Sequence, residues 1–251
     1  MSETKPKFYD FINVYEFETE LPGSGETIKF KPVSTGQIKK LLTYENEKNY
    51  VLQEKALDEL ISSSVLVDGF DVSNMLLDDR FFLLVELRKK TKGEVLEYQI
   101  ECPECGSQSI NRVNLDSLPV KKLDTNLSPT VDLTKGIKVH LRYLTRRDQM
   151  QEIKPNDFPR NMTELQMAYA FNVLFNANAI DKIETPKGID SDIPFKDRVY
   201  FVENIPTGEL DKIKEKLDEM SFGLDLKYST VCVHCKHKNE YQIPIQNNFF
   251  G

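Results

Sequence analysis

The chain has 251 residues, of which 39% are hydrophobic and 29% charged, and its formal net charge of −7 corresponds to a pI near 5.2. This acidic balance argues against a general nucleic-acid binder, which needs basic side chains for phosphate groups. No apolar run approaches the roughly 18 residues that span a bilayer and no signal peptide opens the chain, so we expect a soluble, cytosolic-type protein with one large or two small domains.

The first predicted elements are a β-hairpin and two helices. Alternating apolar residues over 12–33 indicate the hairpin, with a turn at Pro22–Glu26. Its GSGET sequence lacks the Gly-Lys-Ser/Thr ending of a phosphate loop, so we interpret it as a turn. A helix is expected over 36–45, where Ser34 or Thr35 can cap it, and a second helix is expected over about 50–63.

A third helix is expected from Asp78 to Lys92. It begins with Asp78 and Asp79, which we expect to cap it, and it ends with basic residues before Gly93. This polarity suits the helix dipole, and the glycine provides a stop. The sequence FFLLVEL is apolar on almost every side, so we expect the helix to be buried. The basic end could alternatively contact a partner.

A C-x2-C pair follows, Cys102 and Cys105, in the sequence IECPECGSQ. Strand-like segments precede it (EVLEYQIE) and follow it (SINRVNL), so the pair is expected at the tip of a hairpin. Two thiolates on one tight turn can both reach a metal ion, and Gly106 lets the backbone turn back. This hairpin tip therefore supplies half of a metal site.

The region after the first pair predicts a mixture of helices and short strands. After a crossing loop, a strand is expected over 137–144, and Thr145 with Asp148 can cap a short helix. Asn161, with Glu164 three residues later, is expected to cap a longer helix. AIDKIETPKGID predicts a small hairpin, and two helices follow, the second with a narrow apolar stripe.

The second half of the metal site comes at Cys232 and Cys235, the only other cysteines. Their flanks repeat those of the first pair at an offset of 130 residues, with LDLKYSTV before and NEYQIPI after. Lys236 stands where the first pair has glycine, so this turn is expected to be less ideal. The matched apolar positions are Leu96 and Leu226, Tyr98 and Tyr228, Val113 and Ile243, and Leu115 and Ile245. Two such hairpins facing each other form a zinc ribbon.

The four cysteines therefore predict one shared Zn²⁺ site. Its expected ligands are Cys102, Cys105, Cys232 and Cys235. Four thiolates complete a tetrahedral shell and leave no position for water or substrate, so the zinc is expected to be structural. The 126 residues between the pairs exceed ordinary zinc-finger spacing, so we expect them to form an insertion.

Other interpretations of the cysteines stay open. Two disulfides would suit a secreted protein, but the cysteines are not dense. A redox couple would need a helix after its first cysteine, and four reduced thiols without metal are the main rival. His234 and His237 could replace a cysteine ligand, although a solvated turn accounts for both. His140 falls on the polar face of its strand and is expected to have no ligand role.

The predicted fold class is α+β, a zinc-ribbon-like pair of CxxC hairpins with a helical N-terminal part and a mixed α/β insertion between the hairpins. The predicted ranges are 1–118 for the N-terminal hairpin, helices and first CxxC hairpin, 119–223 for the insertion, and 224–251 for the second CxxC hairpin. No nucleophile elbow, Rossmann fingerprint or HExxH motif occurs, so we predict that the chain is not an enzyme. A catalytic pair assembled only in three dimensions is the alternative.

Several segments resemble the baseplate protein family of T-even-type (T4-like) bacteriophages, whose members are linked to the central hub of the tail baseplate. IKFKPVSTGQIKKLL resembles that family's proline-containing strand followed by a helix. LVELRKKTKGEVLEYQIECPEC resembles its apolar helix, glycine and glutamate, strand and CxxC, and FKDRVYFVENIPTGELDKIKEKLDEM resembles its C-terminal helical pair. The resemblance runs from about residue 27 to 245.

This resemblance implies a structural or assembly protein, either a baseplate hub subunit or a hub assembly protein, with no catalytic residues to carry over. Its implied partners are other tail baseplate and hub proteins, with no membrane, nucleic acid or small-molecule substrate. The implied location is the host cytoplasm during assembly or the tail baseplate of the virion. The alternative is a zinc-ribbon nucleic-acid-binding or transcription-associated factor, which a basic, aromatic face around the cysteines would favour.

Overall fold

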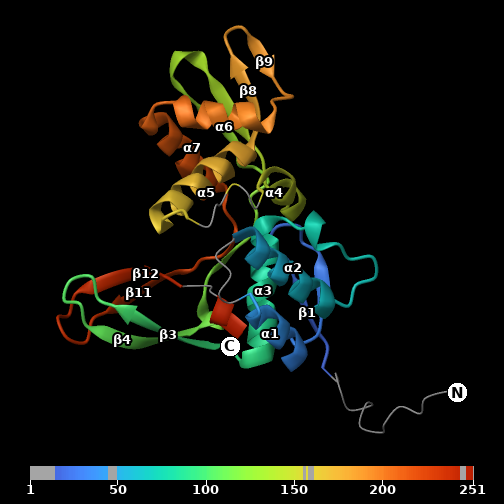
Figure 1. Cartoon of the computed structure of the whole chain (residues 1–251), viewed down its shortest axis with the longest axis vertical. Helices are drawn as coiled ribbons and strands as arrows, with labels where there is room; N and C mark the ends of the chain where they lie inside the picture. The colour runs from blue at the N-terminus through green and yellow to red at the C-terminus, as the bar shows by residue number, and fades with distance from the viewer. Residues whose placement is uncertain (1–14, 45–49, 155–156, 158–160, 244–246, 251) are drawn as a thin grey trace, which may run out of the picture.

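The computed structural model describes residues 15–44, 50–154, 157, 161–243 and 247–250. Figure 1 shows three parts: a helical body, an arm of two long hairpins that extends to one side, and a lobe above both. We call them the core body (residues 17–92), the hairpin arm (95–114 with 227–242) and the inserted lobe (130–220). Helices and small antiparallel sheets occur together, which agrees with the predicted mixture of α and β structure.

The core body is built around α3 (Leu77–Lys92). Leu83, Val85 and Leu87 are completely buried, because the middle of the helix, residues 81–87, is apolar on almost every side and has to be covered all round. The predicted burial of this helix is confirmed. Around it lie β1 (Phe17–Glu20), β2 (Thr27–Phe30), α1 (Thr35–Leu42), α2 (Tyr50–Ser64) and the short 3₁₀ helices η2 (Val72–Asn74) and η6 (Asn247–Phe250).

The first turn of α3 departs from the prediction. Leu76 is the N-cap residue, so Asp78 and Asp79 lie inside the helix and do not cap it. The Asp79 carboxylate instead accepts hydrogen bonds from the N–H groups of Gly23 (2.7 Å) and Ser24 (2.9 Å). The capping prediction was wrong because a carboxylate near a helix N-terminus can also be satisfied by N–H groups of a neighbouring loop.

The predicted turn between β1 and β2 is confirmed. The two strands are antiparallel, with Phe17 opposite Phe30. Gly23 in the turn permits a close contact, since a Cβ atom there would lie 2.4 Å from the ring of Phe222. Phe222 follows the last helix of the inserted lobe, so the turn contacts a segment that is far away in the sequence. The part of the predicted hairpin before Tyr15 lies outside the described residues.

The inserted lobe packs helices against one antiparallel sheet with the strand order β6-β7-β8-β9. Val139, Ala177 and Ile213 are completely buried in a second hydrophobic core. The predicted small hairpin is confirmed, because β8 and β9 pair with each other. The elements of this lobe are β6 (Thr130–Asp132), β7 (Lys138–Leu141), α4 (Arg146–Glu152), α5 (Glu164–Ala179), β8 (Ile180–Thr185), β9 (Gly188–Asp190), α6 (Phe195–Asn204) and α7 (Thr207–Met220).

The caps of α4 and α5 show where local sequence is sufficient and where it is ambiguous. Thr145 and Asp148 form the capping box of α4, as predicted. For α5, however, the N-cap is Thr163, which forms a capping box with Gln166. The prediction of Asn161 was wrong because two overlapping cap sequences occur there, and only one fits the observed start of the helix.

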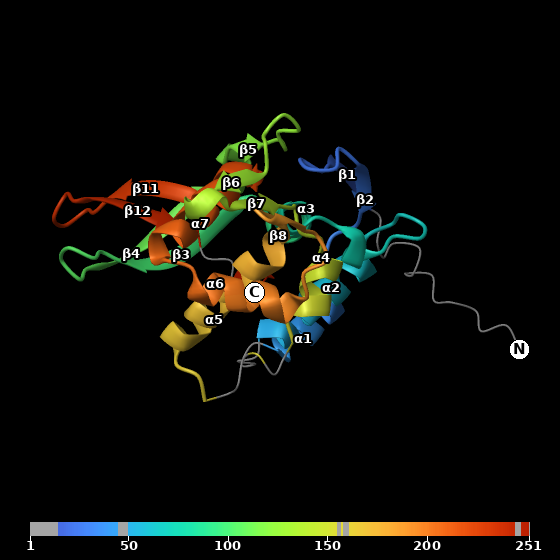
Figure 2. The same cartoon turned by 90° about the horizontal axis from the view of Figure 1, so that it is seen from above.

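The hairpin arm consists of two separate antiparallel hairpins. Its strands are β3 (Val95–Glu101), β4 (Gln108–Asn114), β11 (Lys227–Val231) and β12 (Lys238–Gln242). β3 pairs with β4, and β11 pairs with β12. The two hairpins run side by side with their tips at the same end, as both views show (Figures 1 and 2). They therefore face each other although they are far apart in the sequence.

The inserted lobe leaves the rest of the chain and rejoins it at one place. There β5 (Val120–Lys121) pairs with β10 (Gly223–Leu224) at the base of the arm. These strands lie at the limits predicted for the insertion over 119–223, while the division into 1–118, 119–223 and 224–251 stays a prediction. Within the part of the chain that is described, no helix has the length and apolar character needed to cross a membrane.

A buried ion cluster joins the core body to the inserted lobe. Asp58 of α2 accepts hydrogen bonds from Nε of Arg80 in α3 (2.7 Å) and from Nε of Arg146 in α4 (2.8 Å). Arg80 also pairs with Glu54 at 2.8 Å. Asp58, Arg80 and Arg146 are all buried. Because two carboxylates face two guanidinium groups, the charges balance, which is the condition for burying them.

Candidate metal centre

The tips of the two hairpins bring the four predicted ligands together. The Sγ atoms of Cys102, Cys105, Cys232 and Cys235 all lie within 4.8 Å of one another. Cys102 and Cys232 are buried, whereas Cys105 and Cys235 are exposed, so each hairpin contributes one inner and one outer thiol. The predicted meeting of the two pairs is observed, and their role as metal ligands stays a prediction.

The two CxxC turns have the same backbone hydrogen bond. The N–H of Gly106 donates to the carbonyl of Cys102 (2.8 Å), and the N–H of Lys236 donates to the carbonyl of Cys232 (3.0 Å). Gly106 has a φ of 67° and Lys236 a φ of 62°. This left-handed conformation is higher in energy for a lysine than for a glycine, because the lysine Cβ crowds the backbone. The second turn is therefore the less ideal one, as its sequence predicted.

The closest sulfur contacts run from one hairpin to the other. Cys102 Sγ lies 3.7 Å from Cys235 Sγ, and Cys105 Sγ lies 3.7 Å from Cys232 Sγ. Tetrahedral Zn–S bonds of about 2.3 Å place neighbouring sulfur atoms about 3.8 Å apart, whereas a disulfide needs about 2 Å. All four cysteines are free. The number, type and spacing of the donor atoms therefore fit a tetrahedral metal ion.

Two polar side chains reach across to the sulfur atoms. Ser107 Oγ, from the first hairpin, lies 3.4 Å from Cys232 Sγ and 3.1 Å from Cys105 Sγ. Asn239 of β12 is buried and donates from Nδ2 to Cys102 Sγ at 3.5 Å. Donors around a metal site orient the ligands and favour their charged form. Each side chain therefore connects one hairpin to a thiol of the other.

The sequence prediction did not include Ser107 or Asn239. For Asn239 a signal was present, since it alternates with Tyr241 and Ile243 on the side of β12 that faces the other hairpin. A polar residue on such an inward face, close to a CxxC pair, indicates a hydrogen-bond role. For Ser107 no comparable periodic signal exists, because the residue lies in the turn.

The two thiols of the second hairpin, Cys232 and Cys235, have pKa values shifted in opposite directions. The Ser107 hydroxyl, followed by the N–H groups of Cys235 and His234, lowers the pKa of Cys232 to about 5. The N–H of His237 favours the Cys235 thiolate, but desolvation and the neighbouring thiols outweigh this bond and raise the pKa of Cys235 to about 12. Adjacent thiolates repel one another, and a divalent cation bound between them would remove that repulsion.

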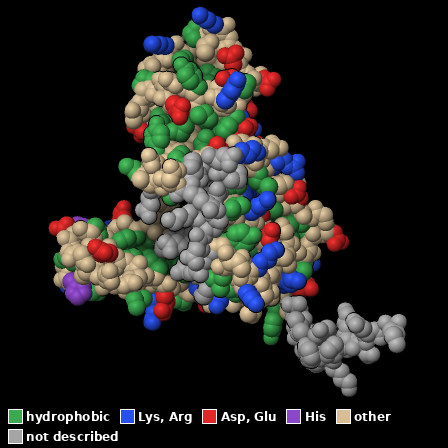
Figure 3. All heavy atoms as spheres, in the orientation of Figure 1, with side chains coloured by type: hydrophobic (Ala, Val, Ile, Leu, Met, Phe, Trp, Pro, Cys, Tyr) green, Lys and Arg blue, Asp and Glu red, His purple; other side chains and the backbone are tan. Residues whose placement is uncertain are grey.

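The histidines lie outside the cysteine cluster. His234 and His237 are exposed, and Figure 3 shows histidine side chains at the outer end of the arm. His140 is in β7 of the inserted lobe, where Nδ1 lies 3.2 Å from Thr130 Oγ1 and Nε2 lies 3.5 Å from Glu184 Oε2. Among the described residues, the four cysteines are the only group of three or more metal-ligating side chains found close together.

The chain is similar to a known family of proteins. A family model described as T4 bacteriophage base plate protein matches residues 12–251, which include the core body, the inserted lobe and all four cysteines. No curated protein and no solved structure matches the chain.

Proposed function

The chain belongs to the T4 bacteriophage base plate protein family, and we propose that it is a structural or assembly protein of the central hub of the tail baseplate. It acts through contacts with other tail proteins, in the host cytoplasm during assembly or in the finished tail. The family match over nearly the whole chain supports the baseplate role. The hub assignment rests on the sequence resemblance of the helix, strand and CxxC segment and of the C-terminal helical pair.

The metal centre in this proposal holds one Zn²⁺ on Cys102, Cys105, Cys232 and Cys235 and gives the arm a zinc-ribbon arrangement. The 3.7 Å sulfur contacts between hairpins are the observation that carries it. When bound, the ion supplies charge neutralisation and a rigid cross-link, and it has no open coordination position. Asn239 holds Cys102 in place from the opposite hairpin. The site is therefore structural, and we propose no enzymatic activity.

The zinc assignment is tested by elemental analysis of purified chain and of Cys105→Ser and Cys232→Ser variants. We expect one zinc per chain, and no zinc in either variant, because each removes one of four required thiolates. Ser229→Ala is a matched control on the same hairpin, since Ser229 is exposed and is not one of the four proposed ligands. Zinc that persists in both cysteine variants would contradict the shared site.

The hub assignment is tested in the phage itself. A phage in which translation of this chain is blocked should produce heads but no complete tails, and a plasmid copy of the chain should restore them. Mass spectrometry of purified particles then separates a resident hub subunit, which is present, from an assembly factor, which is absent. Normal tails without the chain would reject the proposal.

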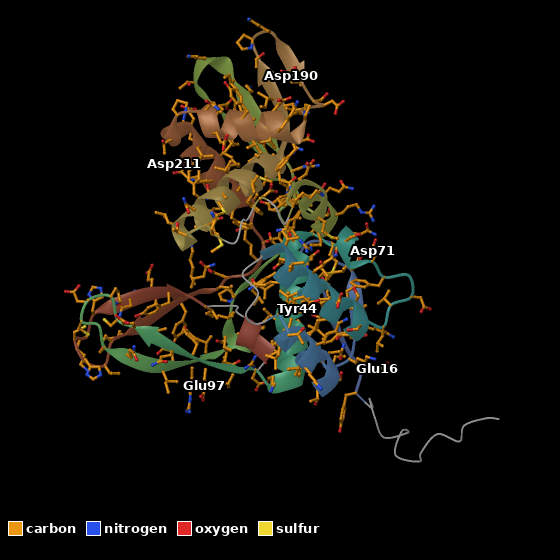
Figure 4. The ribbon with its side chains drawn as sticks, viewed as in Figure 1. Glu16, Tyr44, Asp71, Glu97, Asp190 and Asp211 are labelled. Carbon is orange, nitrogen blue, oxygen red and sulfur yellow. The ribbon has the colours of Figure 1, made fainter. Side chains whose placement is uncertain are left out.

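The nucleic-acid alternative gains no support from the arm. Its first hairpin carries the exposed acidic residues Glu97, Glu101 and Glu104. Glu97, labelled in Figure 4 on the outer side of the arm, is paired with Arg112 at 2.6 Å. Lys236 and Lys238 at the second tip are too few to form a phosphate-binding face. We therefore keep the interaction-protein proposal.

A further inference from the structure

A cavity away from the metal centre lies between the core body and the inserted lobe. It is formed where α3 begins and α7 ends, and its volume is about 220 Å³. Most of its wall is apolar or aromatic. Its apolar lining includes Leu76, Leu144, Phe175, Leu217, Met220 and Phe222. The cavity is open on one side and adjoins a larger groove of about 730 Å³ that shares Asp78, Asp218, Ser221 and Phe222 with it.

The Asp78 carboxylate in this wall lacks a cation. It accepts a hydrogen bond from the N–H of Phe222 at 3.4 Å, and among the described residues no lysine or arginine forms an ion pair with it. Arg142 also lines the cavity, but its guanidinium is held by Asp148 (3.3 Å) and by the side-chain oxygen of Asn178 (3.2 Å). Within the described wall, Asp78 therefore faces the cavity without a compensating charge.

The surroundings of Asp78 increase the stabilisation that a cation bound beside its carboxylate would provide. Burial raises the pKa of Asp78 to about 6, the Phe222 N–H opposes that rise, and the adjacent Asp79 adds to it. Asp218 adds a second negative charge at the opening. The rings of Tyr143 and Phe222 meet edge to face, with centroids 5.8 Å apart. Aromatic rings attract cations as well as apolar groups.

We propose that this cavity is a socket for an arginine side chain of a partner protein. The aliphatic stem would pack on the leucine and methionine side chains, and the guanidinium would meet the Asp78 carboxylate. Arginine suits the site better than lysine, because its planar cation is more weakly hydrated and stacks on aromatic rings. The adjoining groove gives the partner's backbone room to approach. That the guanidinium comes from a protein rests on the structural role proposed above.

The chemistry of the socket is tested with n-butylguanidinium added to the full zinc-loaded chain at pH 7.5, followed by amide NMR. We expect saturable shifts at Tyr143, Ser221 and Phe222, and at least tenfold weaker binding by Asp78→Asn. The amide retains an acceptor for the Phe222 N–H. Asp211→Asn is the control, because Asp211 is an exposed residue on α7 (Figure 4) and should leave binding unchanged.

Several results would overturn the socket. These are no saturable binding, equal binding of uncharged n-pentanol, tighter binding of n-butylammonium, or unchanged binding by Asp78→Asn. If that variant does not fold, wild-type chain serves instead, since binding should weaken when the pH falls from 7.5 to 5 and Asp78 becomes protonated. Asp79 lies beside Asp78, and Asp218 lines the cavity. Arg142 is held by Asp148 and Asn178, and Lys121 and Lys227 line the adjoining groove. Binding that does not change with pH would overturn the assignment.

The partner is tested separately in the phage. A phage with Asp78→Asn should form several-fold fewer complete tails while the level of folded chain stays normal, and unchanged tail numbers would overturn the partner assignment. The probe titration needs neither hub proteins nor tails. Failure of the hub proposal and failure of the socket are therefore distinguishable.

Discussion

The core body buries α3 on all sides, whereas the hairpin arm buries few side chains along its length. Leu96 and Val113 at the base of the arm, and Ile243 just after it, are buried and join the main hydrophobic core. Closer to the tips, the buried side chains are two of the cysteines and Asn239. A pair of isolated hairpins is marginal in water. We propose that a metal ion bound by the four cysteines stabilises the arm, whereas apolar burial stabilises the core body.

The largest effect is expected from removal of the proposed zinc ion. With a strong chelator, we expect amide exchange of β3, β4, β11 and β12 near the tips to accelerate at least about a hundredfold. Protection of α3 and β7 should stay unchanged, because apolar contacts hold them. Hydrogen exchange read by mass spectrometry measures both regions in one sample. Equal loss of protection in arm and core body would show that the two are not independent.

The next largest effect is expected in the ion cluster. Asp58→Ala should lower the free energy of unfolding by about 3–5 kcal/mol, because Arg80 and Arg146 would keep buried charges without their shared carboxylate. Glu59→Ala is the matched control on the same helix. Its partner Lys40 is exposed, so a loss of no more than about 1 kcal/mol is expected. Similar losses in urea unfolding of both variants would contradict the role assigned to Asp58.

A smaller effect is expected at the polar residue that contacts the metal centre. Asn239→Ala should weaken zinc binding about ten- to a hundredfold, because Cys102 loses its cross-hairpin donor. Competition with a chromophoric chelator measures the affinity. Glu240→Ala is the control, since the next residue on β12 points to solvent. If Asn239→Ala leaves the zinc affinity unchanged, the role of Asn239 is restricted to packing between the hairpins.

The smallest effect is expected for glycine-to-alanine substitutions. It depends on whether the added Cβ atom meets a neighbouring side chain. Gly23→Ala should cost about 1–2 kcal/mol, because its Cβ would overlap the Phe222 ring, which has to shift. Gly208→Ala in α7 meets no atom within 4 Å, so it should be neutral or stabilise by no more than about 1 kcal/mol. Thermal unfolding of the two variants provides the comparison. Equal changes in melting temperature for the two variants would show that the Phe222 ring does not penalise a side chain at position 23.

Local sequence predicted those parts of the molecule whose cause is local. The apolar α3, the β8–β9 hairpin and the repeated CxxC flanks each have a periodicity or an offset that can be read from the chain. The contact of Asp58 with Arg146 has no such sign, because the two residues are 88 positions apart and lie in different parts. Likewise, the Asp79 carboxylate of α3 accepts a hydrogen bond from the N–H of Gly23 in the β1–β2 turn. A capping rule based on neighbouring residues cannot predict this contact.

The two halves of the cysteine cluster leave the ribosome at different times. At about 5–20 residues per second, the 126 residues between Cys105 and Cys232 take about 6–25 s to synthesise. During that interval the first pair offers an incoming ion only two thiolates. The residues that form the core of the inserted lobe, from Val131 to Met220, are all translated before the second pair. The two hairpins of the arm can therefore meet only after the inserted lobe has been translated.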